Sequence, residues 1–213
     1  MTTNQLIAML ATDASAVSAR QTDRRFMLRL LLGLVAATMG MQVFLGTRPD
    51  LAAAALLPMF CLKLAFPAGL AVIAAAGLWR LGYPGMRLGR IPFFAVLLIA
   101  MIWAMAGLAL VAADPRERIA MIMGRTWLEC LISITLLSVP ALWLAMRAMR
   151  DLAPVRPALA GAWAGLFAGA AAAFAYALHC PELQAPFLAV WYLTGMLMPA
   201  LTGALLGPRL LHW

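Results

Sequence analysis

Six long apolar stretches occupy most of the chain and constrain its fold more than any other feature of the sequence. Each approaches or exceeds the roughly 20 residues that an α-helix needs to cross a hydrocarbon core about 30 Å thick. Turn-forming residues, such as Arg48-Pro49-Asp50 and Asp114-Pro115, separate them. The stretches are Phe26–Gly46, Leu51–Leu78, Ile91–Ala112, Thr126–Met146, Ala158–Leu178 and Pro186–Leu206.

The composition agrees with a chain that has lipid as part of its solvent. Hydrophobic residues make up 65% of the 213 residues and charged residues only 11%, against roughly 45–50% and about 25% in soluble domains. Backbone polar groups in lipid must be hydrogen-bonded within their own segment, so each span has to be a helix. The sequence therefore predicts an all-α polytopic membrane protein, a bundle of six transmembrane helices joined by short loops.

The distribution of charge predicts the orientation of the bundle. With the N-terminus in the cytoplasm, the inner segments hold eleven arginines against three aspartates, a net charge of +8. The outer loops hold four arginines against five acidic residues, a net charge of −1. This bias follows the positive-inside rule, so we expect both termini in the cytoplasm and a multi-pass protein of a bacterial inner membrane. The basic balance is then a topology signal and no indication of nucleic-acid binding.

These boundaries predict a cytoplasmic N-terminal segment (residues 1–25), a transmembrane domain (26–207) and a cytoplasmic C-terminal tail (208–213). The first apolar stretch has the length of a full span and follows 25 mixed residues, which indicates an anchor and not a cleavable signal peptide. In the N-terminal segment, Leu6, Ile7 and Leu10 form a short apolar face, and Asp13 is placed to cap a turn. Such a segment either lies on the membrane surface or docks into a groove on a cytoplasmic partner.

Two cysteines, Cys130 and Cys180, lie at the predicted outer ends of different spans. On the oxidising side of the membrane, a dithiol can form a disulfide or capture a thiophilic metal. A disulfide needs Cα atoms within about 7 Å, which adjacent helices can satisfy. The neighbours Glu129, His179 and Glu182 supply further ligand types for zinc, cadmium or copper. We therefore predict sensor cysteines that bind such a metal transiently, with no resident cofactor required.

Lys63 lies near the middle of the second apolar stretch. A lysine at the centre of a span costs about 2.5–3.5 kcal/mol on insertion scales, so it indicates either a function or a specific partner. No acidic residue is expected at the same depth. The partners that the sequence offers are carbonyls of neighbouring helices or the hydroxyls of Ser133, Thr135 and Ser138.

Glycines recur at a spacing of four in the last two stretches. Gly161, Gly165 and Gly169 lie in the fifth stretch, and Gly203 and Gly207 in the sixth. Small residues at this spacing let helices approach closely. The contact is made either within the chain or between copies, and the second case would give a homo-oligomer.

The sequence has no CxxC pair, phosphate-binding glycine loop or His/Glu metalloprotease motif, so no conventional enzyme is indicated. Reactive sulfur outside and charged segments inside are the layout of a sensor. Two other classes remain open: a membrane thiol oxidoreductase, which would use the same cysteines with a quinone, and a small transporter, which would use Lys63 and a polar path.

Several short motifs follow one another along nearly the whole chain. They are Leu6-Ile7 to Asp13, Leu62-Lys63-Leu64, Pro84-Gly85, Trp127 with Cys130, Pro140, Leu152-Ala153-Pro154, and Gly161 with Gly165. The most specific is Tyr176-Ala177-Leu178-His179-Cys180-Pro181-Glu182, followed by Phe187 and Trp191-Tyr192. In this order they resemble the NrsF family of six-span membrane anti-sigma factors. The terminal Leu210-Leu211-His212-Trp213 departs from the family's Leu-Leu-Arg-Trp in having His212.

The resemblance implies a protein that binds its cognate extracytoplasmic-function sigma factor at the inner face and keeps it from RNA polymerase. It also implies that the two outer cysteines, here Cys130 and Cys180, take part in the response to heavy-metal or oxidative stress. We place the sigma contact on the apolar face of the N-terminal segment, at Leu6, Ile7, Leu10 and Asp13. The expected partners are this sigma factor and membrane lipids, without direct nucleic-acid contact or catalysis.

Overall fold

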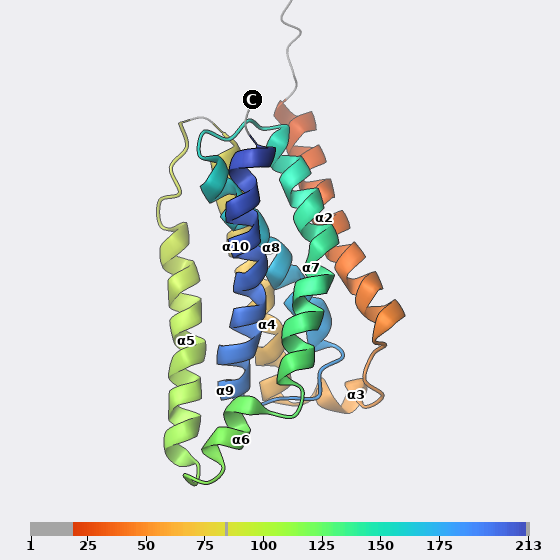
Figure 1. Ribbon diagram of the computed structural model, residues 1–213, viewed down its shortest axis with the longest axis vertical. Coiled ribbons are helices and arrows are strands. Elements are labelled where there is room, and N and C mark those ends of the chain that lie inside the picture. The colour runs from red at the N-terminus through yellow and green to blue at the C-terminus, as the bar shows by residue number, and fades with distance from the viewer. Residues whose placement is uncertain (1–18, 84, 212–213) are drawn as a thin grey trace, which may run out of the picture.

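The chain folds into a bundle of long helices, seen in a computed structural model that describes residues 19–83 and 85–211 (Figure 1). Six helices are long and apolar enough to cross a membrane, and no strand occurs within those ranges, so the predicted helical bundle is confirmed. The spans are α2 (Ala19–Phe44), α4 (Pro58–Gly82), α5 (Ile91–Ala112), α7 (Trp127–Arg150), α8 (Pro157–Ala177) and a composite of α9 (Ala185–Phe187), the π-helical turn η1 (Leu188–Tyr192) and α10 (Leu193–Leu210). The short helices α3 (Leu51–Ala54) and α6 (Arg118–Met123) lie in connections.

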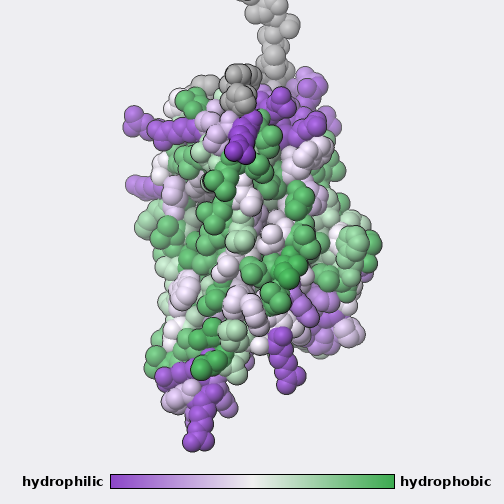
Figure 2. All heavy atoms as spheres, in the orientation of Figure 1, coloured by the Kyte–Doolittle hydropathy of each residue, from purple (hydrophilic) through white to green (hydrophobic). Residues whose placement is uncertain are grey.

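The two ends of the bundle are easily told apart in Figure 1. Helix α2 begins and α10 ends at one of them, which we call the terminal end, and α3 and α6 lie at the other, the α3 end. Between the ends, hydrophobic side chains cover much of the visible surface, and hydrophilic ones gather at the ends (Figure 2). Val43, Leu108 and Val111 are 75%, 73% and 79% exposed. Outward-facing apolar side chains in such a belt are typical of helices that face lipid.

Helix α8 is the central column of the bundle. It packs against α2, α4, α7 and α10, and most of its residues are buried. A methyl group on Gly165 would lie 1.9 Å from the Pro199 carbonyl oxygen, and one on Gly161 would lie 2.0 Å from that of Gly203. The backbones of α8 and α10 are therefore in direct contact. The glycine spacing is used within the chain, and a homo-oligomer through these glycines would need a surface that the two helices already share.

The sequence analysis predicted the start of the second span wrongly. The stretch Leu51–Leu78 is not one helix, because α3 ends at Ala54 and α4 begins at Pro58. Proline suits the first turn of a helix, where its missing N–H needs no partner. Lys63 is thus the sixth residue of α4, only about 8 Å along the axis from its start at roughly 1.5 Å per residue. It lies near the α3 end and not in the middle of a span.

The boundary between the predicted N-terminal segment and the first span lies inside a helix. Helix α2 already begins at Ala19, so residues 19–25 continue the first span toward the terminal end. The remaining predicted spans start and end within four residues of the observed helices, including the composite last one, which runs on to Leu210.

We expect Gly165→Ala to lower the free energy of unfolding by about 1–3 kcal/mol or more, because the added methyl group would meet backbone atoms of α10 that cannot rotate away. Thermal unfolding of the purified protein in detergent measures the loss. Gly107→Ala is the matched control, since Gly107 lies in α5 with no atom within 4 Å of the added carbon. Equal stability of the two variants would contradict the close contact between α8 and α10.

Candidate functional site

The segment from His179 to Glu182, which follows α8 at the α3 end, joins several parts of the chain. The backbone N–H of Arg48 donates to the Leu178 carbonyl at 3.3 Å, next to this segment. The Nδ1 atom of His179 lies 2.8 Å from the Gly46 carbonyl oxygen. The Glu182 carboxylate accepts a hydrogen bond of 2.8 Å from the Arg125 backbone N–H. The 179–182 segment therefore connects the loop after α2 with the approach to α7.

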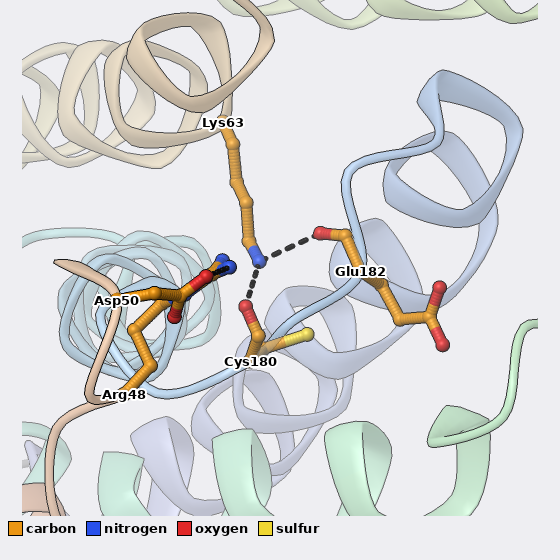
Figure 3. Close-up of polar contacts among 5 residues, drawn as sticks. All are labelled: Arg48, Asp50, Lys63, Cys180 and Glu182. Atoms are coloured by element: carbon orange, nitrogen blue, oxygen red, sulfur yellow. Dashed lines mark hydrogen bonds and ion pairs between the residues drawn. The ribbon is translucent and has the colours of Figure 1, made fainter. Parts of the chain in front are cut away.

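Lys63 binds the same segment from α4, as Figure 3 shows. Its Nζ donates to the backbone carbonyl oxygens of Cys180 at 2.6 Å and Glu182 at 2.8 Å. The Glu182 carboxylate points away from the ammonium group. Nζ also lies 5.5 Å from the centre of the Tyr192 ring, within cation–π range. The lysine side chain is fully buried, and charge-assisted hydrogen bonds offset the cost of burying its charge.

The partners of Lys63 agree only in part with the sequence expectation. Backbone carbonyls were one of the predicted partner types, and they are the ones observed. Two of the three predicted hydroxyls are engaged locally instead: Thr135 donates to the Leu131 carbonyl, and Ser138 donates to the Thr135 carbonyl. These bonds lie within α7, and a short-range bond to the preceding turn is the usual arrangement for such side chains inside a helix.

Both candidate sensor cysteines belong to one buried cluster at the α3 end. Cys130 is the fourth residue of α7 and Cys180 follows the end of α8, yet each has an exposed fraction of 0%. Both are free thiols. We expected thiols that face the outer aqueous side, whereas packing against residues such as Phe187 and Tyr192 removes both from solvent. Access to them therefore requires some part of this cluster to move.

Tyr192 is a member of this cluster that the sequence analysis named only as part of the family motif, without a role in the site. It is the last residue of the π-helical turn η1, a local widening of the helix that often marks functional positions. Its ring lies 6.1 Å from that of Tyr176 and 6.4 Å from that of Phe187, centre to centre. Its buried hydroxyl has no hydrogen-bond partner in the described part of the chain. The π-helical turn leaves no clear sequence signal, so the buried position of Tyr192 could not have been predicted from the motif alone.

The five candidate metal ligands do not form a common site. In residues 19–83 and 85–211, no group of three or more His, Cys, Asp or Glu side chains is arranged to hold a metal ion. Glu129 is exposed, and the other polar neighbours, His179 and Glu182, are engaged by Gly46 and Arg125. What remains of the predicted set is the buried pair of thiols, Cys130 and Cys180.

Arg48 and Asp50 form an ion pair beside the 179–182 segment that the sequence analysis treated only as a turn (Figure 3). The Arg48 guanidinium contacts the Asp50 carboxylate at 2.7 and 2.6 Å. The hydrogen bond from Arg48 lowers the pKa of Asp50 below its ordinary value. The pair fixes the loop that carries Gly46, and hence the partner of His179. The predicted sigma-contact residues Leu6, Ile7, Leu10 and Asp13 lie outside the described residues.

Comparison with known proteins supplies the family. A family profile described as "Negative regulator of sigma F" (NrsF) matches residues 10–213. A "Probable anti-sigma-F factor NrsF" from Azospira oryzae is 46% identical over 213 residues, and an "Anti-sigma-F factor NrsF" from Caulobacter vibrioides is 37% identical over 215, each match covering 100% of both chains. No solved structure matches the chain. The family match thus covers nearly every residue, and the family is described as regulatory and not as catalytic. The chain belongs to the NrsF family of negative regulators of a sigma factor.

Proposed function

We propose that this protein is a membrane anti-sigma factor that sequesters its cognate extracytoplasmic-function sigma factor at the inner face of the bacterial inner membrane. The observation that carries the proposal is full-length similarity to two relatives that are named anti-sigma-F factors. The six apolar helices support membrane insertion. A regulator held at the membrane keeps its bound sigma factor away from RNA polymerase, so no catalytic step is needed.

The positive-inside rule assigns the terminal end to the cytoplasm and the α3 end to the outer side. Of the described acidic residues, only Asp23 and Asp151 belong to the proposed cytoplasmic side, and Asp151 is paired with Arg29 at 2.5 Å. Eleven arginines within the described ranges stand against these two residues there. Cytoplasmic residues 1–18 and the basic loops next to them are then available to a sigma factor, with Leu6, Ile7, Leu10 and Asp13 as its proposed contacts.

We infer that the signal acts on Cys130 and Cys180. An oxidant would join the two thiols or modify them, and a thiophilic metal ion such as cadmium or zinc would bind both transiently as thiolates. Because both side chains are completely buried, neither event fits the observed packing unchanged. A shift of the 179–182 segment would follow, and with it a shift of the helices attached to that segment.

The helices offer a direct mechanical connection to the cytoplasmic side. Cys130 lies in α7 and Cys180 follows α8, and the loop that joins these two helices lies at the terminal end. Helices move largely as stiff units, so displacement at one end alters the loop at the other. A coupling free energy of about 1–3 kcal/mol corresponds to a change of roughly 5- to 150-fold in sigma-factor affinity.

Substitution of either cysteine tests this function in cells. We expect Cys130→Ala and Cys180→Ala each to keep repression of a sigma-dependent reporter gene and to lose its induction by cadmium and by oxidant. Cys61→Ala is the matched control, because Cys61 lies outside the buried cluster, and it should repress and respond normally. Normal induction in both cysteine variants would show that the thiols are not the sensor. In a strain that lacks the protein altogether, the reporter gene should no longer be repressed.

Lys63 is expected to hold Cys180 in its buried position. Lys63→Met removes both hydrogen bonds to the 179–182 segment, each worth about 1.5–3 kcal/mol because the donor is charged. In a Cys61→Ala, Cys130→Ala background, alkylation of Cys180 by a water-soluble maleimide should become at least roughly ten-fold faster. Arg116→Met, which removes an exposed cation of another loop, should leave the rate unchanged. The same slow rate in the Lys63 variant would exclude this positioning role.

A further inference from the structure

Two arginines line a groove at the terminal end, far from the 179–182 segment. Arg87 comes from the loop between α4 and α5, and Arg156 directly precedes α8. Together with neighbouring residues they border a cavity of about 660 Å³. Its apolar part is formed by Leu81, Leu88 and Leu159. The groove thus combines two guanidinium groups with a leucine-lined wall.

Buried and hydrogen-bonded contacts fix the walls of the groove. The Arg80 guanidinium donates to the Leu88 carbonyl at 3.2 Å and to the Arg87 carbonyl at 3.4 Å, which folds the α4–α5 loop back on the end of α4. Beside the groove, Leu152 packs so closely on Gly82 that a methyl group there would lie 2.5 Å from the leucine Cδ1, which holds the α7–α8 loop against the end of α4. The cavity is therefore preformed by contacts within the chain.

The two guanidinium groups carry positive charge that no acidic side chain neutralises in the described part of the chain. Neither arginine forms a salt bridge there: Asp151 pairs with Arg29, and Asp23 accepts hydrogen bonds from Trp79 and from Tyr83, which borders the groove. Arg87 and Arg156 are both exposed. The groove is accordingly complementary to an anion, and a guanidinium fork matches the oxygens of a phosphate group.

We propose that this groove binds one anionic phospholipid, with its phosphate on Arg87 and Arg156 and an acyl chain along Leu81, Leu88 and Leu159. Basic pockets at the cytoplasmic ends of transmembrane helices are suited to anionic headgroups. The apolar wall favours a lipid over an acidic protein segment, because Leu81 and Leu159 belong to the last turn of α4 and the first turn of α8. Those turns belong to two helices that are long and apolar enough to cross a membrane, so in an inserted bundle an acyl chain has access to them. The proposal requires membrane insertion but is independent of sigma-factor binding.

Native mass spectrometry of the full-length protein in mild detergent tests the site. The protein is titrated with phosphatidylglycerol or with phosphatidylcholine of the same acyl chains. We expect one phosphatidylglycerol molecule to be retained in preference. Arg156→Gln should weaken its binding about five-fold, and Arg87→Gln with Arg156→Gln roughly 30-fold, from the attraction of each basic residue to anionic lipid. Arg24→Gln with Arg209→Gln, two exposed arginines of the terminal end outside the groove, should leave binding unchanged.

Each of four results would overturn the proposal. Equal retention of the two lipids would remove the charge preference, and wild-type retention by the Arg87 and Arg156 double variant would place the lipid elsewhere. Equally tight binding of glycerol 3-phosphate alone would identify a soluble anion as the ligand. If the double variant kept its lipid but lost a protein partner, the groove would be a protein interface. Thermal unfolding of the lipid-free variants verifies that they are folded. If the double variant is not folded, the single variant Arg156→Gln is used for the test.

Discussion

The direct backbone contact between α8 and α10 is the constraint on which the rest of the bundle depends. It exists because glycines at positions 161, 165, 203 and 207 present no side chain at the contact. With α10 so close, α8 can occupy the centre of the bundle and still touch α2, α4 and α7. In lipid, where apolar burial supplies little force between helices, this packing of small residues is a main source of association. It also fixes the position of α8 in the bundle, and Cys180 follows the end of that helix.

The α3 end adds a polar arrangement to this apolar column. A buried ammonium group on Lys63 is tolerated because two backbone carbonyls of the 179–182 segment accept its hydrogen bonds. The same segment is held from the other side by the backbone of Arg125. Loss of either connection would release a segment that includes one of the two proposed sensor thiols. In the proposed function, a chemical change at the thiols would therefore move this segment without a separate signalling element.

Much of this could be predicted from the sequence, because the spans depend on local properties. Ile91–Ala112 was predicted with its observed bounds, and the glycine spacing indicated a close helix contact, which the structure makes within the chain, between α8 and α10. The depth of Lys63 was predicted wrongly, since a run of apolar residues conceals the break between α3 and α4. The five candidate metal ligands do not come together for another reason. The side chains of His179 and Glu182 contact Gly46 and Arg125, which are distant in sequence. Such long-range partners, like the π-helical turn at Tyr192, leave no local pattern.

Binding of the sigma factor to the protein in lipid nanodiscs tests the central claim most directly. The affinity is measured with the thiols reduced and again after exposure to cadmium or oxidant. The account predicts stable binding in the reduced state and an affinity that falls roughly 5- to 150-fold after exposure, as expected for a coupling between two sites. Absence of binding in every state would contradict the anti-sigma function itself. Equal affinity before and after exposure would contradict the proposed coupling between the buried thiols and the cytoplasmic face.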